Sequence, residues 1–298
     1  MDLKSNLAKY LLSLDEGDQL QSTRHLAELF DVSLGSISST MNHLEKIGAV
    51  KIDRRGHLGS FLEKKSIKTI WKTIENNPIV IALTLPYFKK CEGMATAIYY
   101  LLNNAGIETY LVFIRGSINR VNALRNCHCN AIVISELAAD ELCDSREEII
   151  LKLPPLSFVD EHRVFFLNKK QDDGEPLTVG IDPESLDIKY TSELEFSDSE
   201  VDFKKMTFTQ IDLHLEDSPV DAAITTSDFL DRLTNKGLES RPLSPKVQKI
   251  VGDRLTSAAI VARSKDVLTK TILQEILDAG KILDIQNKVE KGEMVPRY

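Results

Sequence analysis

The sequence lacks long apolar runs, is poor in cysteine and has no excess of positive charge, and each of these absences excludes a class of protein. None of its apolar runs approaches the ~18 to 20 residues that a membrane-spanning helix needs. The first twenty residues are amphipathic and interrupted by charge, unlike a signal peptide, so we expect a cytoplasmic protein. Four cysteines are too few and too clustered for a disulfide framework.

The cysteines suggest one alternative, a metal site at Cys127, His128 and Cys129. No second CxxC or HxxxH pair stands at the spacing of a zinc finger or ribbon. The run leads directly into the apolar stretch "NAIVIS", so we expect a buried thiol there, with no metal and no cofactor.

Catalytic motifs are also missing. The sequence contains no GxSxG, GxxxxGK or HExxH, and no GxGxxG after a strand. The histidines at 128, 162 and 214 stand singly among apolar or charged neighbours, which is typical of structural histidines. The sequence therefore does not predict an enzyme.

The formal charge of -8 is unevenly placed. Residues 1–65 hold nine Lys or Arg and nine Asp or Glu, so the whole deficit falls on residues 66–298. Because an acidic surface repels phosphates, we expect a nucleic-acid surface only in the first 65 residues.

Those 65 residues predict three helices and a hairpin. Apolar residues at helical spacing predict helices over 3–14, 23–30 and 34–47, with Ser22 and Ser33 as N-caps. Asp31 stands in a three-residue turn, where an Asp tolerates a left-handed conformation. The expected core positions are Leu26, Leu29 and Phe30 in the second helix and Ile37, Met41, Leu44 and Ile47 in the third.

After the third helix, two short extended runs over 49–53 and 60–62 predict a β-hairpin whose tip carries Arg54, Arg55 and His57. Such a wing can contact DNA phosphates. Charges at a solvated turn are equally ordinary, so the hairpin alone does not decide between the two interpretations.

Taken together, "LQSTRHLAELFDVSLGSISSTMNHLEKIGAVKIDRRGHLGSFL" resembles the winged helix-turn-helix of GntR-like bacterial regulators. The likeness lies in the capped second helix, the Ser-x-Gly start of the third, the Leu-x-x-x-Gly exit and the Arg-Gly wing. It departs at Leu34, where those regulators usually carry Arg. The resemblance implies contacts with double-stranded DNA from Arg24, Ser33, Ser36, Ser38, Asn42, Lys51, Arg54, Arg55 and His57.

Residues 66–77 predict a linker helix with one apolar stripe that includes Ile70 and Trp71. This stripe could pack within its own chain or on a second copy. From residue 78 onward, apolar runs alternate with helical segments, which predicts an α/β architecture with parallel sheets. Strands are expected over 79–85, 108–114, 130–136, 163–168, 176–182, 206–210, 220–226 and 258–264, and helices over 91–106, 118–126, 211–216 and 267–280.

This succession resembles the type 2 periplasmic-binding-protein fold, which is the ligand sensor of LysR-like regulators. The stretches "IRGSINRVNALRN" and "VGIDPESLDI" carry the most specific similarity. A GntR-like head joined to such a domain, with the ending "IQNKVEKGEMVPRY", resembles the YhfZ-type transcriptional regulators. The resemblance implies a two-lobe, periplasmic-binding-protein-like α/β domain over 78–298. Lobe 1 would take about 78–160 plus 257–298, and lobe 2 about 161–256.

In a two-lobe sensor the ligand lies in the cleft, where strand ends and helix N-termini favour anionic groups. Arg115 is the leading candidate, because its fork of donors beside a Gly-Ser helix start suits a carboxylate or a phosphate. A salt bridge at a strand end is the alternative role, and turn or cap roles compete at the other positions. The candidates are Tyr87, Lys89, Glu92, Arg115, Gly116, Ser117, Ser135, Asp182, Ser185, Thr225, Thr226 and Asp228.

We therefore expect a cytoplasmic, homodimeric transcriptional regulator that senses a small anionic metabolite. The alternative is a metabolite-binding or catalytic protein of the same fold whose head no longer binds DNA.

Overall fold

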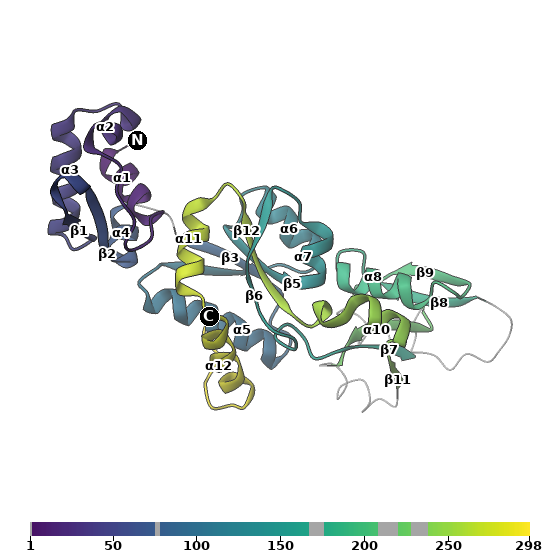
Figure 1. Ribbon diagram of the computed structural model, residues 1–298. Coiled ribbons are helices and arrows are strands. Elements are labelled where there is room, and N and C mark those ends of the chain that lie inside the picture. The colour runs from purple at the N-terminus through teal and green to yellow at the C-terminus, as the bar shows by residue number, and fades with distance from the viewer. Residues whose placement is uncertain (1, 75–77, 167–175, 208–219, 228–237) are drawn as a thin grey trace. The chain divides into compact units, whose positions relative to one another are not determined.

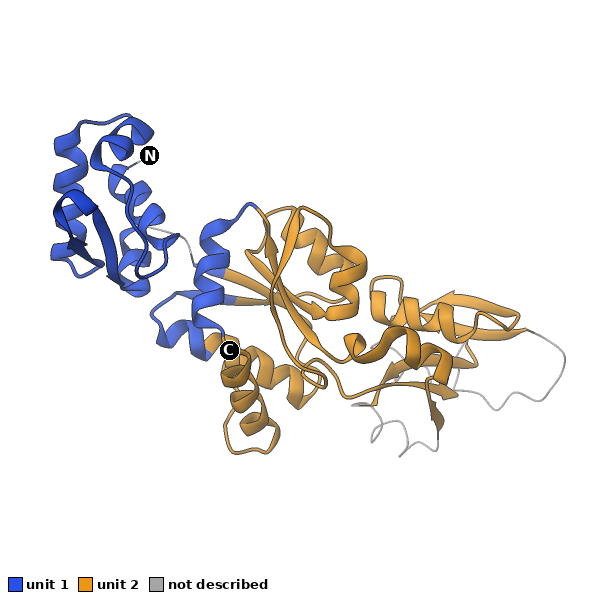
Figure 2. Cartoon of the chain, in the orientation of Figure 1, with its two compact units in different colours: residues 1–79, 100–110, 265–277 blue, residues 80–99, 111–264, 278–298 orange. Residues whose placement is uncertain are grey.

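The computed structural model describes residues 2–74, 78–166, 176–207, 220–227 and 238–298. The chain divides into two compact units, coloured separately in Figure 2. The first unit consists of residues 1–79, 100–110 and 265–277, and the second of residues 80–99, 111–264 and 278–298.

The head of the first unit consists of three helices and a hairpin (Figure 1). Its elements are α1 (Leu3–Leu12), α2 (Thr23–Phe30), α3 (Leu34–Lys46), β1 (Val50–Arg54), the 3₁₀ turn η1 (Gly56–Leu58) and β2 (Ser60–Lys65). The predicted caps are confirmed, since the hydroxyls of Ser22 and Ser33 accept hydrogen bonds from the backbone N–H groups of His25 and Ser36. Asp31 adopts the predicted left-handed conformation, with φ 51° and ψ 54°.

The core of the head follows the predicted apolar stripes with two exceptions. Leu26, Ile37 and Leu44 are buried, but Leu29 is 60% exposed and Ile47 is 40% exposed. The prediction was wrong at both positions, which lie at the C-terminal ends of their helices, where no further helical turn follows to cover them. Helix α4 (Ile67–Thr73) packs against α1, so its apolar stripe is used within its own unit.

The first sheet of the larger region is mixed, and not all-parallel as predicted. Strands β3 and β5 are parallel, whereas β12 runs antiparallel to both of its neighbours, β5 and β6. Helices α6 and α7 pack against β5 (Figure 1). The elements are β3 (Ile79–Leu83), α5 (Lys89–Asn104), β4 (Thr109–Phe113), α6 (Ser117–Arg125), β5 (Ala131–Ser135), α7 (Glu136–Leu142), β6 (Glu147–Lys152) and β12 (Ala258–Arg263), with strand order β4-β3-β5-β12-β6.

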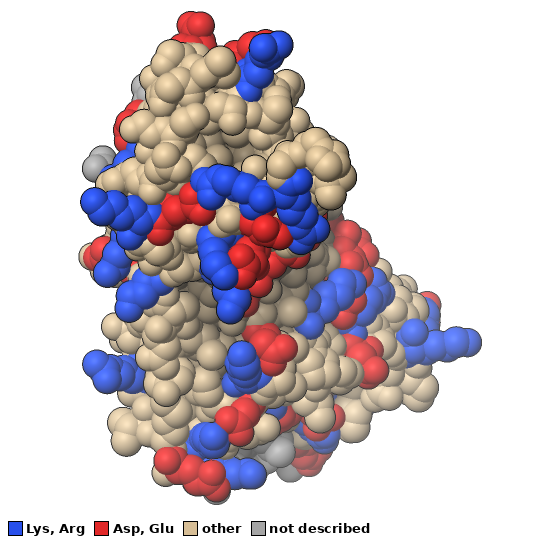
Figure 3. Space-filling model, turned by 60° about the vertical axis from the view of Figure 1, so that its left-hand side comes forward, with Lys and Arg blue, Asp and Glu red and all other residues tan. Residues whose placement is uncertain are grey.

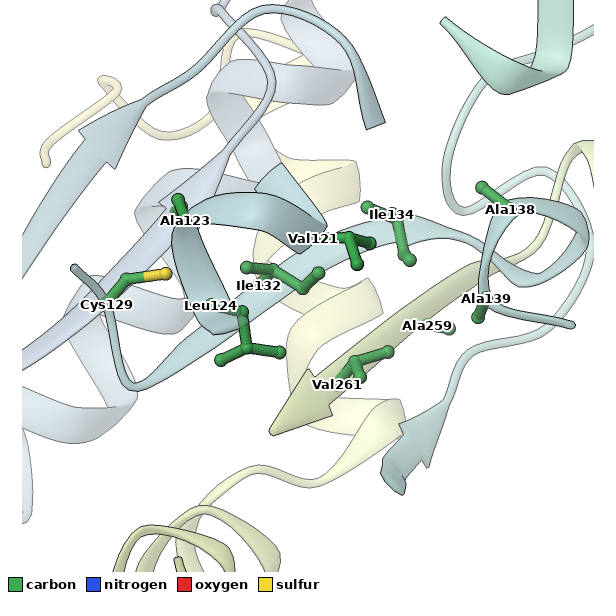
Figure 4. Packing of buried hydrophobic residues seen from close by; sticks show 11 residues of the cluster. Val121, Ala123, Leu124, Cys129, Ile132, Ile134, Ala138, Ala139, Ala259 and Val261 are labelled. Atoms are coloured by element: carbon green, nitrogen blue, oxygen red, sulfur yellow. The ribbon is translucent and has the colours of Figure 1, made fainter. Parts of the chain in front are cut away.

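Side chains of α6, β5 and β12 form a buried cluster in this lobe that includes Leu124, Ile132 and Val261 (Figure 4). Cys129 belongs to the same cluster, and burial raises the pKa of its thiol to about 11. Cys127, two residues earlier, is exposed. The buried-thiol interpretation is therefore confirmed for Cys129.

The second sheet has β7 and β10 at its centre, paired antiparallel, with β8 parallel to β10. Buried Val164, Val179 and Ile224 form its apolar core. The elements are β7 (His162–Phe166), β8 (Leu177–Ile181), α8 (Leu186–Glu195), β9 (Val201–Lys205), β10 (Ala222–Thr226), β11 (Glu239–Pro242), α10 (Pro245–Val251) and the 3₁₀ turn η4 (Gly252–Leu255), with strand order β11-β7-β10-β8-β9.

One predicted strand differs from the structure. The edge strand β9 precedes the strand expected at 206–210, and the described residues of that run, Met206 and Thr207, lie outside any strand. Strand β9 is mostly exposed, so it lacks the apolar pattern that marks a buried strand. The remaining residues of that run and the helix expected at 211–216 lie outside the described residues.

The helix predicted over 267–280 is two helices, α11 (Val267–Ile276) and α12 (Ala279–Glu290). Leu277 is extended, and a carboxylate oxygen of Asp278 accepts a 2.9 Å hydrogen bond from the backbone N–H of Lys281. Asp278 therefore caps a new helix where the apolar periodicity alone predicts a continuation.

Two stretches of chain, 153–161 and 252–257, connect the two sheets. We call the part built on the first sheet lobe 1 and the part built on the second sheet lobe 2. They are bonded to each other, since the Phe158 N–H donates to the carbonyl of Thr256 at 2.8 Å. The side-chain amide of Gln286 on α12 donates to the carbonyls of Lys90 and Ser157 at 3.0 and 2.9 Å. The connection is therefore tied both to itself and to lobe 1.

Candidate functional site

A groove on the head is formed by the start of α2, the third helix α3 and the hairpin. It contains three of the predicted DNA-contacting residues, Ser38, Asn42 and Arg54. The Arg54 guanidinium lies 3.5 Å from the amide oxygen of Asn42. The groove thus brings residues suited to base edges and to phosphates side by side.

Other predicted DNA contacts lie outside this groove. Arg24 and Ser33 line a neighbouring hollow together with Leu34, which is 51% exposed. The hydroxyl of Ser36 is hydrogen-bonded to that of Ser33 at 2.8 Å, so these two side chains serve the helix cap. His57 is exposed in the turn between the strands.

The cations of the hairpin have acidic partners within the head. Arg54 donates to the carboxylate of Glu45, which raises the pKa of Arg54. Arg55 pairs with Asp53 at 2.7 Å, and Lys51 pairs with Glu63. On the face shown in Figure 3, blue basic and red acidic side chains lie next to each other. DNA must therefore compete with these carboxylates for the basic side chains.

Sequence reasoning missed part of the groove. Gln19, Gln21 and Thr23 line it together with the N-cap Ser22. Their position directly around the cap of α2 is the signal that could have found them, because a helix N-terminus is a common phosphate contact.

A cavity of about 70 Å³, partly open to solvent, lies between the two lobes of the second unit. Both lobes contribute to its walls through the ends of strands and the starts of helices. Its lining consists of Thr84, Tyr87, Phe88, Arg115, Gly116, Ser117, Arg120, Phe158, Val159, His162, Asp182, Ser185, Asp187, Ile188 and Thr226.

The structure thus brings together many of the predicted ligand residues. These are Tyr87, Arg115, Gly116, Ser117, Asp182, Ser185 and Thr226. The loop before α6 approaches lobe 2 closely, since a Cβ added at Gly116 would lie 2.5 Å from the carbonyl oxygen of Glu184. The hydroxyl of Ser117 accepts a 3.0 Å hydrogen bond from the Leu186 N–H, also across the lobes.

The guanidinium of Arg115 donates hydrogen bonds to two carboxylates of lobe 2. One guanidinium nitrogen donates to Asp182 at 2.7 Å, and the other donates to Glu184. The amide of Asn119 donates to the same Glu184 carboxylate at 2.8 Å. The salt bridge considered for Arg115 is therefore present, and its charge is balanced by acidic partners.

Four other predicted ligand residues that the structure describes do not line the cavity. Lys89 and Glu92 pair with each other at 3.1 Å on α5. Ser135 is buried at the N-cap of α7, and Thr225 is buried on β10. Asp228 lies outside the described residues.

Three charged or titratable lining residues were missed, namely Arg120, His162 and Asp187. Burial lowers the pKa of Arg120 to about 10 and that of His162 to about 4. Burial raises the pKa of Asp187 to about 6, although the hydroxyl of Ser135 donates to it at 2.6 Å. Arg120 and Asp187 stand inside the quoted stretches "IRGSINRVNALRN" and "VGIDPESLDI", so a signal was present. Each lies within a helix, behind the loop residues that were chosen.

Comparison with known families identifies the family to which the chain belongs. Residues 15–62 match the family described as a helix-turn-helix domain, and residues 66–298 match the family described as the YhfZ C-terminal domain. The chain belongs to the YhfZ family. It is 29% identical over 295 residues to YhfZ of Escherichia coli strain K12, covering 99% of this chain and 96% of that protein.

Solved structures agree with this assignment. The crystal structure of YhfZ from Shigella flexneri matches 78% of this chain and 98% of its own, with 29% identity and a TM-score of 0.64. The periplasmic aliphatic sulphonate binding protein SsuA from Escherichia coli matches 74% of this chain and 76% of its own, with 12% identity and a TM-score of 0.52. The fold of this YhfZ-family chain is thus periplasmic-binding-protein-like behind a helix-turn-helix head, as predicted.

A helix-turn-helix domain joined to a YhfZ C-terminal domain indicates a DNA-binding regulator rather than an enzyme. Within the described residues, no helix is long and apolar enough to cross a membrane.

Proposed function

We propose that this YhfZ-family chain is a ligand-responsive bacterial transcriptional regulator. Its head binds double-stranded DNA, and the cavity between its lobes binds a small metabolite that carries an anionic group. The observation that supports DNA binding most directly is the groove in which Asn42 of α3 lies beside Arg54 of the hairpin. An amide can bond a base edge, and a guanidinium can bond a phosphate.

One head covers one half-site, so we propose that the protein acts as a homodimer on a near-palindrome. The two α3 helices would enter successive major grooves, with half-sites ~34 Å apart. This role requires a cytoplasmic protein, and the GntR-like subclass of the head stays a prediction. Ligand would change DNA affinity only if it binds the DNA-bound and free arrangements with different free energies.

The test of DNA binding uses variants in the groove. Arg54→Ala combined with Arg55→Ala should weaken binding to all sequences and flatten the dependence on salt, because phosphate contacts release counterions. Asn42→Ala should relax the choice at one base position. Arg146→Ala is the control, since Arg146 is an exposed arginine of the other unit that pairs with Asp144 at 2.7 Å. Unchanged binding in both groove variants would contradict the assignment.

A second candidate is a metabolite-binding or catalytic protein whose head no longer binds DNA. Two observations favour it, namely the exposed Leu34 at the start of α3 and the acidic partners of the hairpin cations. Lack of sequence-selective binding by the wild-type protein at every salt concentration would select this candidate.

A further inference from the structure

Among the described residues, the cavity between the lobes gathers buried polar atoms that have no hydrogen-bond partner. They are Nε of Arg120, Nδ1 of His162 and Oγ1 of Thr226. The three residues are only 3%, 5% and 5% exposed. His162 and Thr226 stand opposite each other on β7 and β10. Because a buried polar group without a partner is unfavourable, their convergence on one cavity points to a ligand.

The charges of the lining indicate what kind of ligand this is. The guanidinium of Arg115 is balanced by Asp182 and Glu184. Arg120 and Asp187 carry opposite charges and line the same cavity. The described lining residues therefore hold no surplus of positive charge. The charge of a ligand with high net negative charge would stay uncompensated there. A ligand of zero net charge brings no excess charge that the cavity has to compensate.

The chemistry of Arg120 and Asp187 is complementary. Arg120 donates one N–H to the carbonyl of Ile114 at 2.8 Å, and its Nε–H is left for an acceptor. Asp187 offers a carboxylate, of which one oxygen accepts from Ser135. A donor-only cation beside an acceptor anion matches a molecule with a carboxylate and an ammonium group close together.

Another part of the described lining is apolar. Phe88, Phe158, Val159 and Ile188 line the same cavity. They suit an uncharged hydrocarbon or aromatic group, and a charged side chain on the ligand would be buried against them at a cost.

We propose that the cavity binds an α-amino acid with an apolar side chain. Arg120 holds its carboxylate, Asp187 holds its ammonium group, and His162 and Thr226 complete the hydrogen bonds. This inference rests on the proposed function, because it takes the cavity as the sensor site. It specifies the metabolite with an anionic group as a zwitterion.

The experiment is calorimetric titration of the full chain with L-leucine, L-methionine and L-phenylalanine. The matched probes are 3-phenylpropionate, which lacks the ammonium group, phenethylamine, which lacks the carboxylate, and succinate, which has two carboxylates. We expect at least one amino acid to bind. For L-phenylalanine, whose side chain the first two probes share, removal of either charged group should weaken binding by about tenfold or more.

Two threonines supply matched variants. Thr226→Val removes a cavity hydroxyl, whereas Thr225→Val removes a neighbouring buried hydroxyl of β10 that does not line the cavity. Neither hydroxyl has a partner among the described residues, so both variants should fold. We expect Thr226→Val to weaken amino-acid binding about fivefold or more and Thr225→Val to leave it unchanged. Asp187→Asn should weaken binding of the amino acid and leave binding of 3-phenylpropionate unchanged.

Binding of succinate without any amino acid would overturn the zwitterion and leave the proposed sensor in place. Binding of none of the probes, or equal effects of the two threonine variants, would overturn the inference about the cavity. The titration contains no DNA, so each result is independent of whether the head binds its operator.

Discussion

The hydroxyl of Ser135, the last residue of β5, donates a 2.6 Å hydrogen bond to the carboxylate of Asp187 in the first turn of α8. This bond joins the two lobes beside the cavity. Both residues are buried, so the carboxylate is held away from water at the position where we place the ligand's ammonium group.

Asp187→Asn should stabilise the protein in a pH-dependent way. The folded-state pKa of Asp187 is about 6, above its ordinary value of 3.8, because burial disfavours the charged form. Its contribution to stability is therefore fully present below about pH 4 and is lost as pH rises through 6. At pH 7.5 the variant avoids this loss, so its free energy of unfolding should exceed that of the wild type by up to about 3 kcal/mol.

Urea denaturation at pH 4.5 and 7.5 measures this difference. His162, whose pKa is lowered, shifts stability in the opposite direction with pH, but equally in both proteins. Asp198→Asn is a control of opposite sign, because the hydrogen bond from Lys246 lowers the pKa of Asp198. The same stability difference at both pH values would contradict the buried, ionised Asp187.

Gly116→Ala should open the contact between the lobes. Gly116 has φ +78°, and an added Cβ would meet the Glu184 carbonyl at 2.5 Å, so backbone strain and a steric clash combine. We expect a loss of about 2 kcal/mol or more in the free energy of unfolding.

Gly292→Ala separates the two effects. Gly292 has φ +74° with nothing within 4 Å of an added Cβ, so this variant carries only the backbone strain. Chemical denaturation of the two variants gives the comparison. Equal losses in both would show that the close approach at Gly116 is unimportant.

Glu45→Gln should strengthen DNA binding by the head. Removal of this carboxylate releases Arg54 for a phosphate, so affinity for all sequences should rise about threefold to tenfold, and the salt dependence should steepen by about one counterion. Fluorescence anisotropy at several salt concentrations measures both quantities. Glu136→Gln, which removes the partner of Lys152 outside the head, has the same change in net charge and should not alter DNA binding.

Much of the fold could be predicted, because its signals are local. A pattern of a few residues is enough to predict the caps at Ser22 and Ser33. The same holds for the buried strands β3, β5 and β12. Exposed β9 lacks an apolar pattern, and the break before α12 depends on a single Asp at the cap. The direction of β12 depends on the path of the chain through the other lobe, which no local pattern encodes.

The sequence predicted the loop residues that line the candidate cavity but not the helical residues that line it. Arg115 and Gly116 stand directly after a strand, where site residues are expected, and they line the cavity. Arg120 and Asp187 lie inside helices α6 and α8, and burial shifts their pKa values. Whether a helical Arg or Asp faces a cavity or solvent depends on tertiary packing.

The proposed regulator couples ligand binding in the cavity to DNA binding by the head. Binding of the full chain to DNA flanking its own gene should be measured across salt concentrations, with and without apolar L-amino acids. We expect sequence-selective binding that weakens with salt and whose affinity shifts with one amino acid. The absence of selective binding at every salt concentration, or selective binding that no amino acid changes, would contradict this coupling.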